Sequence, residues 1–227
     1  MSVEFTVVSL GAMSSNPFWS ERPGLRTPHA TTTLVRDEDR LILVDPSLPG
    51  VALVNRLFER TGLRSEQITD VFCTTLRPTH RRSIEAFGQA RWTCGEQELL
   101  AYRQTLETLA ESAERRGAQL EQAVRTDLDL LERFTAAPDK LTRSVHLFPL
   151  PGASVGSAGL LLAAPNRTVL VAGDAAVTSE HVLAGRVWSG SADAVAAMQS
   201  LTEIIEIADV IVCGHDNYML SPTRWMA

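Results

Sequence analysis

Side chains that can transfer protons or bind a metal stand at the ends of four apolar stretches of this sequence. They are Asp45, His80, Asp174 and His215, and a glycine directly precedes the last two. Functional groups of α/β proteins gather where strands end in short turns. Carboxylates and imidazoles at such ends could act as general acids and bases or as metal ligands. The alternative, that each group only satisfies its own turn, stays open on these positions alone.

Eight apolar runs predict the strands that would position these groups. The runs are short, and the turns at 36–40 and 165–167 join neighbouring runs into hairpins. The predicted strands are Phe5–Leu10, Thr31–Val35, Leu41–Val44, Ile68–Thr74, Val145–Leu150, Gly159–Ala164, Thr168–Ala172 and Val210–Cys213.

Helical periodicity predicts the elements that would cover these strands. One helix follows Gly50 and stops at Gly62, and its predicted buried face is Val51, Val54, Leu57 and Phe58. A short helix lies near Ser83–Phe87, and a long helical stretch runs from Glu96 to Phe134 with a break at Gly117. The last helix runs from Ala192 to Ile207. Its predicted N-cap is Ser191, and its predicted buried side is Val195, Met198, Leu201, Ile205 and Ala208.

The composition is that of an ordinary folded protein rather than a nucleic-acid-binding or membrane protein. The chain has 227 residues, of which 44% are hydrophobic, and a net charge of -6. Without a basic tract, nucleic acid is not an expected partner, and no apolar run is long enough to span a membrane. The three cysteines have no metal-binding spacing, and no secretory signal is visible at the start. We therefore expect a cytoplasmic protein.

Five blocks of the sequence match a known series of motifs in order and spacing. Residues 71–80, VFCTTLRPTH, correspond to the pattern apolar-apolar-x-T-H-x-H-x-D-H, and residues 149–157, PLPGASVGS, correspond to T-P-G-H-T-x-G-S. The other blocks are LILVD at 41–45, VLVAGD at 169–174 and VIVCGH at 210–215. Across nearly its whole length the chain resembles the metallo-β-lactamase superfamily. The resemblance implies one α/β domain, a four-layer αββα sandwich over residues 1–227. The helical insert at 96–134 carries nine acidic and five basic residues, which favours a solvated face, with a lid or a dimer element as the alternative.

The chain departs from the family motifs at most of the metal-ligand positions. The family's first metal is held by three histidines, and here those positions are Thr75, Arg77 and Ala153. At the second metal site Thr79 replaces an aspartate, while His80, Asp174 and His215 remain. The resemblance therefore implies a centre with at most one metal and three protein ligands. It also implies that Asp45 steadies a loop or a ligand.

The resemblance implies a hydrolase of an ester, thioester, amide or lactone, with metal-activated water as the nucleophile. Zinc is the expected metal, iron and manganese are alternatives, and a metal-free protein is a further one. Thr79 could hydrogen-bond the water without taking its proton, and Arg77 could stabilise an anionic substrate or oxyanion. The alternative function is non-catalytic binding of a small anionic ligand through Arg77. The expected partner is thus a small molecule, and a homodimer is a further expectation.

Two further imidazoles, His29 and His181, could supply a replacement ligand. His29 precedes a strand that leads toward the cavity in this family, and His181 follows Asp174 by seven residues. The sequence leaves the roles of both open.

Overall fold

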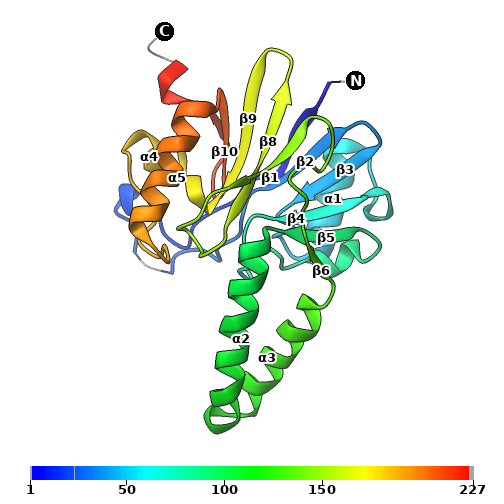
Figure 1. Ribbon diagram of the computed structural model, residues 1–227, viewed down its shortest axis with the longest axis vertical. Coiled ribbons are helices and arrows are strands. Elements are labelled where there is room, and N and C mark those ends of the chain that lie inside the picture. Colours follow the sequence, from blue (N-terminus) through cyan, green and yellow to red (C-terminus); the bar gives the residue numbers. More distant parts are fainter. Residues whose placement is uncertain (1, 23, 225–227) are drawn as a thin grey trace.

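Two β-sheets packed face to face form the centre of the molecule, and helices cover both outer faces (Figure 1). The computed structural model describes residues 2–22 and 24–224. Apolar side chains from both sheets fill the space between them, among them Val44 and Phe72 from one sheet and Leu160, Val171 and Val212 from the other. The predicted αββα sandwich is confirmed.

The first sheet contains six strands in the order β1-β2-β3-β4-β5-β6. The pairs β1–β2 and β2–β3 are antiparallel, whereas β3 to β6 run parallel. The bounds are β1 Glu4–Ser9, β2 Thr32–Asp37, β3 Arg40–Val44, β4 Asp70–Cys73, β5 Arg91–Cys94 and β6 Phe134–Ala136. The carboxyl ends of β3 and β4 consequently lie at the same edge.

The second sheet contains five strands in the order β11-β10-β9-β8-β7. Only β9 and β10 pair in parallel, so their carboxyl ends also share an edge. The bounds are β7 Val145–Pro149, β8 Ala158–Ala164, β9 Arg167–Gly173, β10 Val210–Cys213 and β11 Tyr218–Leu220.

The helices divide between the two outer faces. On the first sheet lies α1 (Gly50–Thr61), together with the parts of α2 (Glu96–Arg116) and α3 (Ala118–Leu131) that are nearest the sandwich. The second sheet is covered by α4 (Ser179–Leu183) and α5 (Ala194–Ile207). None of the described helices is both long and apolar enough to cross a membrane.

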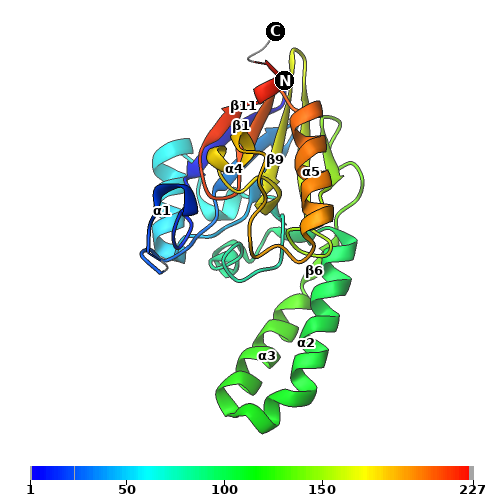
Figure 2. The same ribbon diagram turned by 90° about the vertical axis from the view of Figure 1, so that its left-hand side faces the viewer.

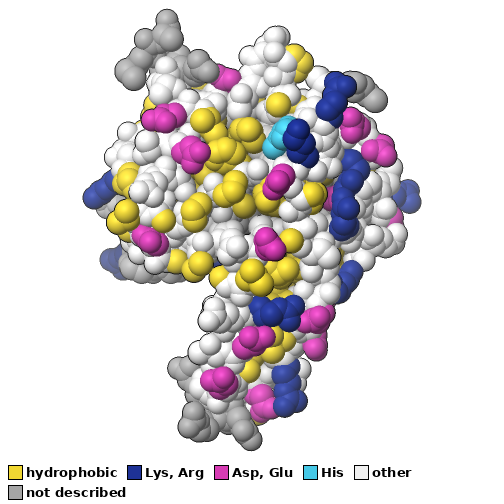
Figure 3. Space-filling model, viewed as in Figure 1, with side chains coloured by type: hydrophobic (Ala, Val, Ile, Leu, Met, Phe, Trp, Pro, Cys, Tyr) yellow, Lys and Arg dark blue, Asp and Glu magenta, His cyan; other side chains and the backbone are white. Residues whose placement is uncertain are grey.

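The α2–α3 pair forms a hairpin that extends well beyond the sandwich (Figures 1 and 2). The predicted helical stretch is thus two helices broken at Gly117, as expected. Hydrophobic side chains run along the junction between the two helices, flanked by charged side chains (Figure 3). A network at the base ties both helices to the body, since Arg81 donates to Tyr102 at 2.9 Å and to Asp127 at 2.8 Å.

Several element predictions were wrong in detail. Phe134 begins strand β6 rather than ending the helix, and the short elements β5, β6, β11 and α4 were not predicted. In α1 the buried residues are Leu53 and Leu57, while Val51 and Phe58 are exposed. The face shared by Leu53 and Leu57 packs on the sheet.

The last helix also differs from its prediction. Its N-cap is Asp193 rather than Ser191, because the Asp193 carboxylate accepts from the backbone amides of Val195 and Ala196 at 2.8 and 3.0 Å. The buried side also differs in part from the predicted one, although Leu201 and Ala208 are buried as expected. It consists of Ala197, Ser200, Leu201 and Ile204, whereas Val195 and Met198 are exposed.

Candidate metal centre

The four strand ends singled out in the sequence meet at one edge of the sandwich. Asp45 follows β3, Asp174 follows β9 and His215 lies beyond β10, while His80 closes the loop after β4. The two sheets approach so closely here that a Cβ atom on Gly173 would lie 2.3 Å from Thr74 Oγ1. Gly173 also has a φ of +54°, which residues with a side chain rarely adopt. Both the lack of space and the backbone conformation therefore require a glycine here.

His80, Asp174 and His215 bring one ligand atom each to a common point. These atoms all lie within 4.8 Å of one another. Asp174 Oδ1 is 3.2 Å from His80 Nε2 and 3.1 Å from His215 Nε2. Among the described residues, His80 Nε2 and Asp174 Oδ1 are nevertheless buried without a well-directed hydrogen bond. Buried polar atoms that lie close together without a well-directed hydrogen bond are typical of ligands arranged around a shared cation.

Asp45 and a pair of backbone carbonyls orient the two imidazoles. His80 Nδ1 lies 3.1 Å from Asp45 Oδ2, and His215 Nδ1 donates to the carbonyl oxygens of His29 and Ala12 at 2.9 and 3.2 Å. A proton held at Nδ1 leaves the lone pair of a neutral imidazole on Nε2. Both rings therefore aim Nε2 at Asp174.

Asp45 is itself held rigidly. Its carboxylate accepts from the Thr74 amide at 2.8 Å and from the Thr74 hydroxyl at 2.7 Å. Its backbone has a φ of +51°, which is uncommon for a residue with a side chain. Such strain is characteristic of residues that a surrounding structure holds in place.

The carboxylates control the charge of the cluster. Burial opposes a charged His80, but the carboxylates of Asp174 and Asp45 outweigh it and raise the pKa of His80 to about 10. Burial likewise opposes a charged Asp174, yet His80 and His215 hold the pKa of this carboxyl well below its ordinary value. Without a metal, the cluster is therefore an ion pair of imidazolium and carboxylate.

Arg77 occupies the side of Asp174 that faces away from the imidazoles. Its Nη1 donates to Asp174 Oδ2 at 2.8 Å, and its Nη2 donates to the carbonyl oxygen of Ala153. The indole of Trp188 covers the guanidinium, with 4.5 Å from Cζ to the ring centroid. The two oxygens of Asp174 thus face different partners, a fixed cation on one side and two imidazoles on the other.

Solved structures resemble this fold over most of the chain, although no protein-family model and no curated protein sequence matches it. A protein of Thermotoga maritima, named as a candidate metallo-β-lactamase, superposes with a TM-score of 0.70 at 18% identity, over 97% of this chain and 100% of the other. A mutant of the B. thuringiensis protein AiiA, with N-decanoyl-L-homoserine bound at its active site, gives 0.62 at 19% identity, over 95% and 94%. AidC, a dizinc quorum-quenching lactonase, gives 0.62 at 18% identity, over 78% and 67%.

The chain has the metallo-β-lactamase fold.

The positions of the lost ligands in this metallo-β-lactamase-fold protein are filled by groups that bind each other rather than a metal. Thr75 and Ser154, next to Ala153, donate their hydroxyls to the carboxylate of Glu98, each at 2.7 Å. Glu98 also accepts from the amide of Leu76 at 2.8 Å and from that of Gly156 at 3.3 Å. Together with Arg77, this network leaves no ligand set for a first metal among the described residues.

Glu98 was missed in the sequence. It lies in the first turn of α2 among several acidic residues that read as a solvated face, yet it is only 3% exposed. The one available signal was its place four residues beyond the end of the short strand β5, which was itself not predicted.

The remaining candidate residues lie outside the cluster. Thr79 lines a depression beside α3, and its hydroxyl has no hydrogen bond to a described residue. The ring of His29 lies 3.1 Å from the carbonyl oxygen of Leu10, and His181 pairs with Thr178 at 2.8 Å and packs on Phe18. Neither His29 nor His181 belongs to the metal-ligating group found among the described residues.

Proposed function

We propose that the protein hydrolyses an ester, thioester, amide or lactone and uses at most one divalent metal, held by His80, Asp174 and His215. The observation that carries this proposal is the convergence of three ligand atoms within 4.8 Å, two of them buried and without a hydrogen bond. Structures of the same fold include lactonases, which supports a hydrolase.

The donor set fits a metal of intermediate softness. Two imidazole nitrogens and one carboxylate suit zinc, iron(II) or manganese and leave positions open for other ligands. When bound there, such a metal supplies a Lewis acid that polarises a carbonyl group or activates water.

The residues of the chain determine how the substrate and the metal are held. Asp45 and the carbonyls of Ala12 and His29 keep both imidazoles in the ligating tautomer. Arg77 places a permanent positive charge on the opposite side of Asp174. Because like charges repel, this guanidinium disfavours a second metal and favours an anionic oxygen that develops on the substrate.

Proton transfer is not assigned to Thr79. A neutral threonine hydroxyl is too weakly basic to take a proton from water, and Thr79 lies beside α3 rather than in the cluster. The catalytic role expected for Thr79 therefore stays a prediction, whereas that of Arg77 forms part of the proposal.

The alternative function, binding of an anionic ligand through Arg77 without a metal, is less well supported. It would give no role to the converging atoms of His80, Asp174 and His215, two of which are buried without a directed hydrogen bond. The small-molecule partner, a cytoplasmic location and a homodimer through residues 96–134 belong to the proposal as further expectations.

Metal analysis of protein purified without chelators tests the proposal. We expect about one equivalent of zinc, iron or manganese in the parent, and none in the double variant His80→Ala/Asp174→Ala. His146→Ala, on strand β7, is the matched control and should keep the metal. Esters, thioesters and lactones would then be screened for hydrolysis. No metal in the parent, even after addition of excess zinc, manganese and iron(II), would overturn the hydrolase and favour the binding protein.

A further inference from the structure

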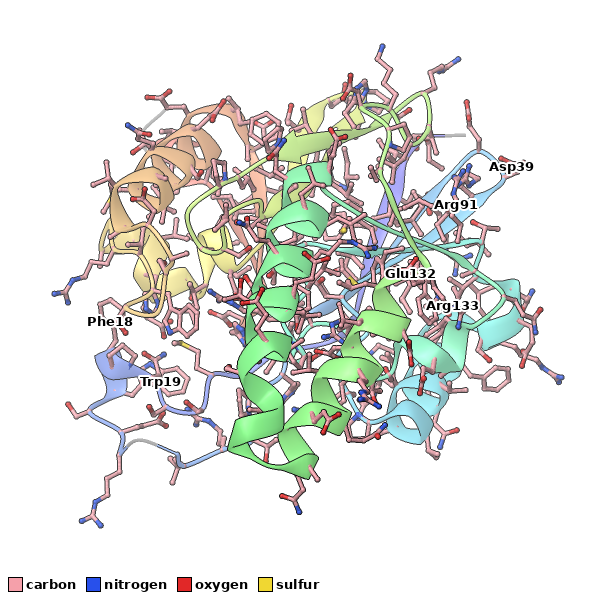
Figure 4. The ribbon with its side chains drawn as sticks, turned by 60° about the horizontal axis from the view of Figure 1, so that its bottom comes forward. Phe18, Trp19, Asp39, Arg91, Glu132 and Arg133 are labelled. Carbon is pink, nitrogen blue, oxygen red and sulfur yellow. The ribbon has the colours of Figure 1, made fainter. Side chains whose placement is uncertain are left out.

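A pocket of about 250 Å³ opens beside His215, between the N-terminal segment and the region around α4. Its wall includes Met13, Trp19, Arg26, Glu180, His215 and Asp216. Phe18 and Trp19 project from the N-terminal segment on this side of the molecule (Figure 4). Since His215 belongs to the candidate metal centre, a molecule in this pocket would lie next to that centre.

Two of the three charged side chains in the wall are fully engaged with the protein. The Asp216 carboxylate accepts from the backbone and the hydroxyl of Ser179 at 3.1 and 2.5 Å and from the amide of Asn217 at 2.7 Å. Arg26 forms a two-pronged ion pair with Glu21, with 2.8 Å from Nη1 to Oε1. The charge of Arg26 is therefore neutralised within the wall.

Glu180 differs from these two residues. Its Oε1 accepts from the Trp19 indole at 2.9 Å. Its Oε2 is buried and has no hydrogen-bond partner among the described residues. A buried carboxylate oxygen without a donor is unfavourable, and a positively charged donor would satisfy it best.

We propose that Glu180 binds a protonated amine of the substrate, so that the substrate is a small amino-substituted ester or lactone. The inference rests on the proposed hydrolase function. The acyl group would lie toward His215 and the ammonium group toward Glu180, while Met13 and Trp19 contact the carbon skeleton. A pocket of this volume, at the low end for small-molecule sites, suits a compact substrate without a long chain.

The experiment compares α-amino-γ-butyrolactone with γ-butyrolactone, which lacks the amine. At pH 6.5, below the ordinary pKa of an α-amino group at about 7.7, the first carries a positive charge. We expect kcat/KM of the parent to be at least about tenfold higher for the amino-lactone. The variant Glu180→Gln should lose that preference through a higher KM for the amino-lactone. Glu203→Gln, an exposed glutamate of α5, is the control.

The outcomes separate this inference from the proposed function. Equal rates for both lactones in the parent, or an equal effect of Glu180→Gln on both, would overturn the role of Glu180 and leave the hydrolase intact. If neither lactone is hydrolysed, calorimetry measures how tightly the parent and Glu180→Gln bind the two ring-opened products, 2-amino-4-hydroxybutyrate and 4-hydroxybutyrate. Tighter binding of the amino acid by the parent alone supports Glu180, and equal binding refutes it.

Discussion

His80 lies between two carboxylates, and its Nε2 is the atom that would bind either a proton or a metal ion. Asp45 faces its Nδ1 and Asp174 faces its Nε2, at 3.1 and 3.2 Å. In the absence of a metal, both carboxylates favour the imidazolium form. A metal requires the Nε2 lone pair, so a metal ion and a proton compete for the same atom. We therefore expect metal affinity to fall as the pH is lowered.

The charge of His80 predicts how the stability of the metal-free protein depends on pH. The folded-state pKa of about 10 lies above the ordinary value of 6.5. The stabilisation is therefore fully present below pH 6.5 and is lost as the pH rises toward 10. Asp174, with its lowered pKa, contributes in the opposite sense: its stabilisation is lost only as the pH falls into the acid range.

Urea unfolding of the chelator-treated parent and of His80→Gln, between pH 6 and 10, measures this effect. The parent should be more stable than the variant near pH 6, and the difference should shrink steadily toward pH 10. A difference that stays constant across this range would show that folding does not raise the pKa of His80.

At the scale of the elements, the sequence predicted the strands whose ends meet at the candidate site but not the residues that surround it. Apolar runs that end in Asp45, Asp174 and His215 identify strands, and parallel pairing brings their ends together. Short strands such as β6, with three residues, carry too little periodicity to be distinguished from the end of a helix. This is why Phe134 was assigned to the helical stretch.

Contacts between elements could not be predicted either. Glu98 has the same residue type as its exposed neighbours on α2, and only the approach of two loops makes it a buried acceptor. The N-cap of α5 shows the same limitation. Ser191 and Asp193 both suit the position by type, and the backbone course of the loop selects Asp193.

We expect the hydrogen bonds of Glu98, which join α2 to the loops that flank Arg77, to contribute strongly to the stability of the protein. In Glu98→Gln one oxygen becomes an amide NH₂, which cannot accept from Ser154 and Gly156. Because buried hydrogen bonds to charged groups are worth about 1.5–3 kcal/mol, we expect a loss of roughly that size in the free energy of unfolding. Urea titration measures it, with the exposed Glu107→Gln as control. Equal stability of the two variants would contradict a structural role for Glu98.

We expect that the candidate metal centre can form only if the two sheets approach closely at Gly173. Gly173→Ala places a Cβ 2.3 Å from Thr74 Oγ1, whereas Gly185, with a similar φ of +58°, has nothing within 4 Å of its Cβ. Gly185→Ala should therefore cost about 1 kcal/mol for the backbone alone. Gly173→Ala should cost at least about 2 kcal/mol more and abolish metal binding. Similar losses in both variants, measured by urea unfolding and metal analysis, would show that the strand ends can separate.

At the scale of the whole molecule, the candidate metal centre joins the two halves of the sandwich. His80 comes from the first sheet, while Asp174 and His215 come from the second. The hairpin α2–α3 stands outside this junction, but Glu98 and Arg81 fasten its base to the loop that carries His80. The site, the two sheets and the base of the hairpin thus form one connected structure.

A metal held between the two sheets should stabilise the entire fold. A ligand present at 100 times its Kd stabilises a protein by about 2.7 kcal/mol, which for a chain of 227 residues corresponds to a rise of about 5–10 °C in Tm. Differential scanning calorimetry with zinc, manganese and iron(II) should show this rise in the parent and its reversal by a chelator. His80→Ala/Asp174→Ala should not respond, whereas His146→Ala should. An equal rise in the double variant would mean that the metal binds elsewhere and that the three side chains do not form the centre.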